Sequence, residues 1–241
     1  MRQIWTITKR ELRSFFDSLI AYIMMIAFLG FSGFFTWLYG GDVFFVGQAS
    51  LQTFFEIAFW TLFFFIPALT MRLFAEENRS GTIELLLTRP VTDWQVVVGK
   101  FMSTLILIGI ALALTLPYYI TVANIGNIDH GAVITGYLGL LLMSMAYISI
   151  GIFTSSITNN QIVAFLITLF IGIFFHLICA VLAGSTSGVF SRLFNYLSLQ
   201  NHFNSIARGV VDSRDLIYFL SIALIGLVST EAVLARRNVS E

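Results

Sequence analysis

The chain has 241 residues, of which 58% are hydrophobic and 11% are charged, and its 13 basic and 13 acidic side chains give a formal net charge of zero. About a quarter of the residues in a soluble domain are charged, so this composition excludes an ordinary soluble protein and indicates a chain that lies in a lipid bilayer. The length leaves room for one membrane domain over residues 1–241, but little room for a separate soluble enzyme or nucleic-acid-binding module.

The first segment, residues 1–18, has the pattern of an amphipathic helix that lies on the membrane surface. Its apolar face carries Trp5, Leu12 and Phe16, and basic residues occupy the opposite face. Cations and a tryptophan suit the headgroup layer, so the predicted interfacial anchor consists of Trp5, Lys9, Arg10 and Arg13. The pattern leaves open whether this helix only anchors the next span or also acts as a lever.

Long apolar runs predict the fold class. A bilayer core about 30 Å thick needs about 20 apolar residues in a helix. Six runs of about that length follow one another: Leu19–Tyr39, Phe54–Phe74, Phe101–Ala123, Ala132–Ser156, Ile162–Ala183 and Leu216–Leu234. No small-residue cleavage pattern follows the first run, so we expect it to be retained. The predicted fold is therefore an all-α, polytopic membrane protein with six transmembrane helices.

Four residues in or near these runs are candidates for a functional role. Pro67 in the second run and Pro117 in the third each remove a backbone hydrogen bond, which predicts kinks beside the loop between these runs. They are candidates for gating, or they only shape the helices. Glu56 and Glu231 lie near the ends of their runs, where an acid either reaches the headgroups or serves a function.

The fourth run carries small side chains on one face, at Ser144, Gly151 and Ser155. Small residues let two helices approach closely in a membrane. We expect this face to pack against a neighbouring helix, and a polar conduit wall is the alternative.

The loop over residues 75–98 holds much of the chain's charge. Gly81 and Thr82 can end one segment and start another, and the next residues give a short helix an apolar stripe that stops at Pro90. Thr92 and Gln95 then match a capping box that opens the third span. We expect the short helix to be a coupling element that docks on a cytoplasmic partner, and the alternative is a helix packed on its own bundle. The residues assigned to this role are Glu76, Glu77, Gly81, Thr82, Ile83, Glu84, Leu86, Leu87 and Pro90.

The segment over residues 184–214 predicts a broken helix pair on the outer side. Apolar residues recur there at helical spacing, and a turn follows at Gly209. This pair is expected to lie re-entrant or at the interface, either capping a transport route or acting as a static plug. The candidate cap residues are Phe190, Phe194, His202, Arg208 and Gly209.

The positions of the basic residues predict the orientation. Lysines and arginines gather in the N-terminal segment, in the loop over residues 75–98 and its edges, and in the C-terminal tail. Basic residues in short loops stay in the cytoplasm, so both termini are expected there, in a bacterial inner membrane. Arg192, Arg208 and Arg214 disagree with this topology, and contacts with lipid phosphates would reconcile Arg192 and Arg208 with it.

The loop also carries a family resemblance. The pattern E-x-x-x-x-G-T-x-E-x-L-L-x-x-P-V-T from Glu76 to Thr92, followed by Gly99-Lys100, resembles the signature of ABC-2-type permeases. Residues 159–165, 201–203, 206–212 and 215–219 resemble the gliding-motility-associated permeases of this family (GldF). The resemblance extends over essentially the whole chain.

The resemblance implies a permease subunit of an ATP-driven exporter, associated with gliding motility or envelope biogenesis. The expected partners are ABC ATPase subunits, a second permease copy or a related permease, the lipid bilayer and an accessory extracytoplasmic subunit, without nucleic acid. No G-x-x-x-x-G-K-[ST] phosphate loop occurs in the chain. We therefore expect ATP and Mg in the partner ATPase, and neither a cofactor nor a metal in this chain.

Other classes of function remain in competition. An intramembrane enzyme would need a nucleophile with a base, paired acids or a metal cluster. His130, His176 and His202 are widely separated, and Cys179 has no second cysteine in the chain with which to form a disulfide or a CxxC site. A passive channel and a membrane scaffold remain alternatives. A passive channel needs no docking helix for an ATPase, and co-purification with an ATPase would distinguish an exporter subunit from a scaffold.

Overall fold

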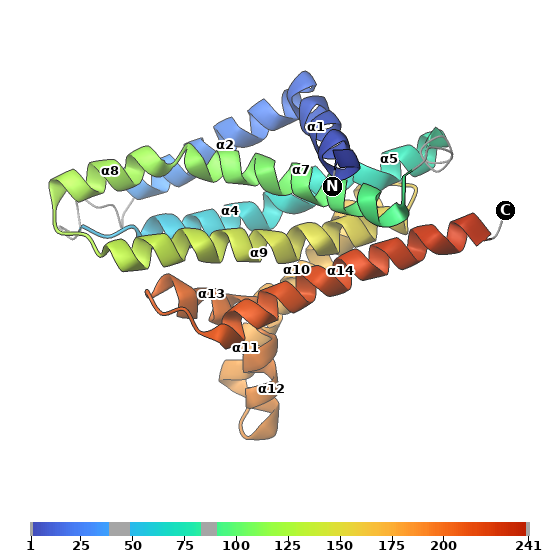
Figure 1. The fold of residues 1–241 in the computed structure, drawn as a ribbon. Coiled ribbons are helices and arrows are strands. Elements are labelled where there is room, and N and C mark those ends of the chain that lie inside the picture. Colours follow the sequence, from blue (N-terminus) through green and yellow to red (C-terminus); the bar gives the residue numbers. More distant parts are fainter. Residues whose placement is uncertain (1, 39–48, 83–90, 240–241) are drawn as a thin grey trace.

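The computed structural model describes residues 2–38, 49–82 and 91–239, and these ranges consist of helices joined by short turns (Figure 1). Within these ranges, six helical stretches of 19 to 33 residues are long and apolar enough to cross a membrane, as the sequence predicts. They are α2 (Leu19–Trp37), α4 (Gln52–Thr70) with α5 (Arg72–Ser80), α7 (Asp93–Ala113) with α8 (Leu116–Ile125), α9 (His130–Ser156), α10 (Gln161–Ile173) with the π-helical η1 (Phe174–Ile178) and α11 (Cys179–Ser185), and α14 (Ser213–Val239).

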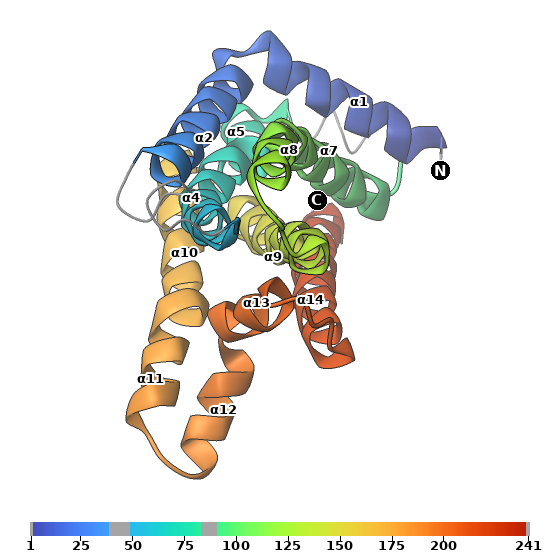
Figure 2. The same ribbon diagram turned by 90° about the vertical axis from the view of Figure 1, so that its left-hand side faces the viewer.

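Both ends of the described chain lie at the same end of the bundle (Figure 1). The N-terminal helix α1 (Arg2–Asp17) crosses this end obliquely, beside α5 and the first turns of α7 (Figures 1 and 2). We call it the basic end, because it carries the predicted clusters of arginine and lysine, and we call the opposite end the distal end. The prediction of a helix before the first span is confirmed.

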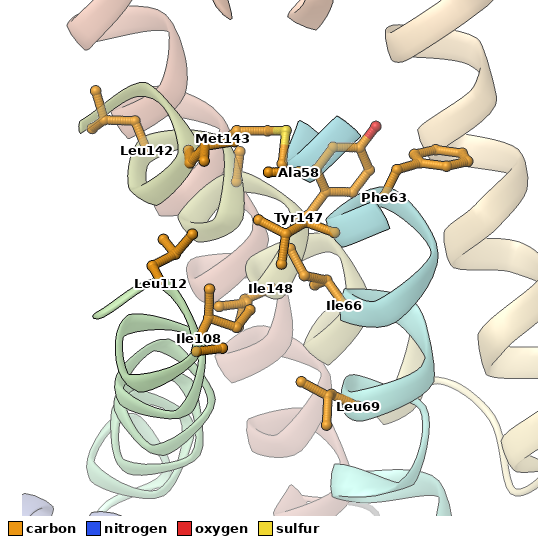
Figure 3. Close-up of a cluster of buried hydrophobic side chains, with 14 of the residues drawn as sticks. Ala58, Phe63, Ile66, Leu69, Ile108, Leu112, Leu142, Met143, Tyr147 and Ile148 are labelled. Carbon is orange, nitrogen blue, oxygen red and sulfur yellow. The ribbon is translucent and has the colours of Figure 1, made fainter. Parts of the chain in front are cut away.

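Helix α9 is the centre of the bundle, and it packs against α4, α7, α10, α13 and α14. Ile66 of α4, Ile108 of α7 and Tyr147 and Ile148 of α9 meet in a buried apolar cluster (Figure 3). Close packing is needed because lipid tails are as apolar as these side chains, so helices associate in a membrane through shape and contact. A Cβ added at Gly151 would overlap the Thr70 side chain, so this part of the small-residue face of α9 serves helix packing.

The two prolines lie at different kinds of position. Pro67 lies inside α4, which continues to Thr70 before a single turn residue, Met71, separates it from α5. Pro117 instead lies in the first turn of α8, where a missing N–H leaves no intrahelical hydrogen bond unmade. The third span is therefore two helices joined at Leu114 and Thr115, not one helix with a proline in its interior.

The predicted broken helix pair is present as α12 (Val189–Leu197) and α13 (Leu199–Ala207). Gly188 and Gly209 bound the pair with positive φ angles of 73° and 94°, which glycine adopts without steric cost. Helix α13 packs on α9, whereas the hairpin of α11 and α12 projects sideways from the bundle (Figures 1 and 2).

Candidate functional site

The candidate site is the basic end around the loop between α5 and α7. Helix α5 ends at Gly81, whose φ of 69° places it in the left-handed conformation of a helix C-cap. Thr82 follows and its hydroxyl lies 2.8 Å from that of Ser80. The predicted short helix, with Ile83, Glu84, Leu86, Leu87 and Pro90, lies outside the described residues.

The far side of the loop opens α7 with the predicted capping box. The Gln95 N–H donates to Thr92 Oγ1 over 3.4 Å, and the Thr92 N–H donates to Gln95 Oε1 over 3.3 Å. Two backbone donors that the helix leaves free are thereby satisfied, so the end of the loop is fixed at Thr92.

A buried ion-pair cluster joins three helices behind the loop. The ammonium of Lys100, only 1% exposed, donates over 2.7 Å both to Glu77 Oε1 of α5 and to the Leu73 carbonyl. Glu11 Oε2 of α1 lies 3.6 Å away, and the ammonium lies 5.0 Å from the centroid of the Phe74 ring. We call these residues the Lys100 centre. A cation inside a membrane helix is costly unless it is paired, so the centre keeps α1, α5 and α7 together.

The electrostatics of Glu11 reflect this pairing. Burial by itself would raise the pKa of the Glu11 carboxyl, but the charges of Lys100 and of Arg10, whose guanidinium lies 2.7 Å away, outweigh burial and lower the pKa below 4.5. Glu11 is therefore a carboxylate at neutral pH and completes the cluster as an ion. Glu77 Oε2 is buried and has no hydrogen-bond partner among the described residues.

Helix α1 packs closely on α7 at Gly99, the residue before Lys100. A Cβ at position 99 would come within 2.7 Å of the Ile7 side chain, and the Thr8 hydroxyl lies 3.2 Å from the Gly99 carbonyl oxygen. Only a glycine leaves room for this approach. The Gly99-Lys100 pair thus combines a close contact with α1 and an ion pair to it.

Helix α5 is also fixed to α9 and to the turn that follows it. Ser155 Oγ accepts hydrogen bonds from the N–H groups of Phe74 and Ala75, each over 3.0 Å, and donates to the Met71 carbonyl. The Asn78 amide donates to the Ser156 and Thr158 carbonyls. Any displacement of the loop's first half would therefore act on α7 and α9 together.

Two hollows flank this cluster. A polar cavity of about 480 Å³ lies between α1 and α5, with Lys100, Glu77 and Arg72 among its lining residues. A smaller hollow of about 330 Å³ is lined mostly by apolar surface from α1, Val91 and Val96. This second hollow opens beside the loop and could take an apolar side chain of a partner protein.

The predicted interfacial anchor lies on the free side of α1. Trp5 is 61% exposed, and Lys9, Arg10 and Arg13 are exposed as well. The face of α1 that packs on the protein carries Thr8 and Phe15 as its buried residues. Leu12 and Phe16 of the predicted apolar face are half-buried and pack against the same core, and the contact with Gly99 and the Lys100 centre also set the rotation of α1.

The predicted cap residues divide into two groups. His202 is buried in α13, while Arg208 and Gly209, which end this helix, lie near the start of α9. Arg208 lines a distal cavity of about 800 Å³ together with Glu56 and Asp129. Phe190 and Phe194 instead lie on α12, none of whose residues is buried, so the structure does not bring all five cap residues together.

The sequence reading missed Lys100 and Glu11 as site residues. A signal existed, because Lys100 follows an apolar stretch and precedes a span, and an ionisable residue within a membrane helix calls for a partner. Glu11 gave no such signal, since it is one of several charged residues in an amphipathic helix.

The family model described as ABC-2 family transporter protein matches residues 5–235. No curated protein matches the chain.

Proposed function

Because this match covers nearly the whole chain, the protein belongs to the ABC-2 family of transporter membrane proteins, and we propose that a separate ABC ATPase drives it by docking on the loop between α5 and α7. As a member of this family it is a multi-pass permease, the membrane subunit of a transporter. The ATPase, with its ATP and Mg, is the partner that such a subunit requires, and the loop is its docking site in our proposal.

The observation that carries the proposal is the Lys100 centre. It joins α5, the helix that leads into the loop, to the transmembrane helix α7 and to α1. The contacts of α5 are made by Glu77 and the Leu73 carbonyl. A partner that pulls or pushes the loop would therefore move α1, α5 and α7 as one unit. A passive channel would have no use for a loop fixed in this way to three helices.

The basic end faces the cytoplasm in this proposal. The basic residues of α1, of α5 and of the end of α14 lie at this end, which is the distribution of cytoplasmic segments in membrane proteins. The cap residues and the cavity with Glu56 and Arg208 then lie on the outer side.

A dimer of permeases exporting cargo is the further part of the proposal. The interior of the bundle is filled by large apolar side chains, as around Tyr147 (Figure 3), so a route for cargo would lie between two copies or between this chain and a related permease. The resemblance of residues 201–219 to gliding-motility permeases supports a role in motility or envelope biogenesis.

The test is retention of the ATPase in a detergent pull-down at matched permease abundance. Glu84→Lys and Leu86→Asp should each lower retention, because one adds a repulsive charge and the other a desolvation cost at the proposed docking site. Glu56→Lys is the matched control, since it makes the same charge change at an exposed glutamate on the distal end. Undiminished retention in both loop variants would remove the loop as the docking site.

A further inference from the structure

A buried histidine lies where the distal helices meet the sixth span. His202 of α13 is 8% exposed, and its Nδ1 lies 2.6 Å from Asp215 Oδ1, in the first turn of α14. Its Nε2 lies 2.9 Å from the carbonyl oxygen of Tyr196, in the last turn of α12. One imidazole ring therefore connects three helices.

The two partners of His202 determine its protonation state. A carbonyl oxygen only accepts hydrogen bonds, and an ionised carboxylate also only accepts them, whereas a neutral imidazole has a single N–H. Asp215 lies at a helix N-terminus, where the helix dipole favours the ionised carboxylate. With that carboxylate ionised, both ring nitrogens donate, so the two contacts of His202 are those of an imidazolium. The Tyr218 ring stacks on the His202 ring, with 4.0 Å between the two ring centroids, as suits a cation.

Helix α12 packs along α11, and the same contacts join it to α13 and α14. No residue of α12 is buried, and its attachment to α13 and α14 runs through its last turn. The Tyr196 carbonyl accepts from His202, the Leu197 carbonyl accepts from the Tyr218 hydroxyl, and Asn195 Oδ1 accepts from the Asn201 amide over 2.7 Å. Carbonyls at a helix C-terminus need donors from outside the helix, and a cation there also suits the helix dipole.

We propose that the proton of His202 controls a clasp that holds α12 on the sixth span. Loss of this proton leaves one N–H for two acceptors, so a lone pair faces either the Tyr196 carbonyl or the Asp215 carboxylate. Both arrangements are repulsive and both weaken the link between α12 and α14. The clasp is closed while His202 carries this proton and opens when the proton is lost.

The groups around His202 are consistent with control of the clasp by the proton of His202 itself. The ionisable groups that face it are Asp215 and Tyr218 of α14 and Tyr196 of α12. Of the other elements against α13, η1 carries His176, whose Nδ1 bonds to Tyr147 of α9, and α11 carries the buried thiol of Cys179. Helix α9 meets α13 at Gly139, against Phe203 and Ile206.

The test uses distances between two spin labels in the full-length protein in lipid bilayers. Labels go on cysteines placed at the exposed positions Arg192 of α12 and Asn127 of the turn before α9, after Cys179→Ala. Measurements at about pH 5.5 and about pH 9 bracket the range in which histidine side chains titrate. We expect one distance population at the lower pH and a second, displaced population at the higher pH.

Three variants separate the clasp from other causes. His202→Gln should abolish the difference between the two pH values, because the imidazole ring that carries the proposed proton is gone. His130→Gln is the matched control, since His130 is exposed at the distal end and bonds to the Tyr119 hydroxyl; it should leave the difference intact. Tyr218→Phe removes the hydrogen bond to the Leu197 carbonyl but not the histidine, so it should also keep the difference between the two pH values.

Equal distances at both pH values in the wild type, a shift retained by His202→Gln, or a shift lost in His130→Gln would overturn the proposal.

Discussion

At the scale of single residues, the Lys100 centre shows how a membrane protein tolerates charge. Lys100 has close contacts with Glu77, with the Leu73 carbonyl and with Glu11. A buried ion pair contributes little net stability when it is compared with an apolar replacement, but the removal of one partner leaves an unpaired buried charge. The cluster therefore specifies how three helices meet more than it stabilises the bundle.

Lys100→Met should accordingly destabilise the protein by about 3–5 kcal/mol, because it leaves Glu77 without its cation. The double variant Lys100→Met with Glu77→Met should recover most of this loss, since both charges are gone. Unfolding of purified protein in mixed detergent micelles measures both variants. A double variant no more stable than the single one would show that the pair is not the cause.

Glu11 predicts a pH dependence with a definite sign. Because the folded protein holds the pKa of Glu11 below 4.5, the carboxylate stabilises the fold above this value, and the stabilisation is lost as the pH falls through the lowered pKa. Unfolding midpoints of the wild type and Glu11→Gln should therefore differ at about pH 6 and converge towards about pH 3. A difference between the two unfolding midpoints that stays constant over this pH range would contradict the role of Glu11 as an ion.

At the scale of elements, local chemistry predicted some boundaries and missed others. The capping box of Thr92 and Gln95 and the turn at Gly209 are visible in the sequence, because each depends on neighbouring residues alone. The separation of α4 from α5 at Met71 is not visible in the sequence. It depends on a distant residue, because Ser155 of α9 accepts hydrogen bonds from the N–H groups at the start of α5. The close contact of α1 with Gly99 is not visible in the sequence for the same kind of reason, since Gly99 belongs to another helix.

This role of Ser155 can be measured against a neighbour. Ser155→Ala removes the acceptor for Phe74 and Ala75 at a buried site and should cost about 1–3 kcal/mol. Ser144→Ala is the control, because Ser144 is also fully buried in α9 but its hydroxyl donates to Leu140 of its own helix. Equal losses of stability in the two variants would indicate that Ser155 does not fix the junction.

At the scale of the whole molecule, the sequence predicted the number and the approximate limits of the spans. Runs of apolar residues determine these, because every unpaired backbone group in lipid is costly and helices satisfy them all. The sequence did not predict the sideways course of α11 and α12 (Figures 1 and 2), since direction depends on contacts between helices. The sequence also did not predict the Lys100 centre, because its members are far apart in the chain.

The orientation in the membrane is a prediction of its own. A single cysteine at Asn127 should react with an impermeant thiol reagent added to intact cells, whereas one at Arg79 should react only after the cells are opened, both after Cys179→Ala. Both positions are exposed in the structure, so access from each side, and not burial, decides the result. The reverse pattern would place the basic end outside.

The central claim is that an ATPase docks at the loop between α5 and α7, and photo-crosslinking tests it most directly. A photoreactive amino acid at Arg79, exposed in the last turn of α5, should crosslink to the ATPase in membranes that contain the complete transporter. The same amino acid at Asn127, exposed at the distal end, should give no such product. An ATPase that co-purifies with the permease but crosslinks at neither position, or only at Asn127, would contradict the account.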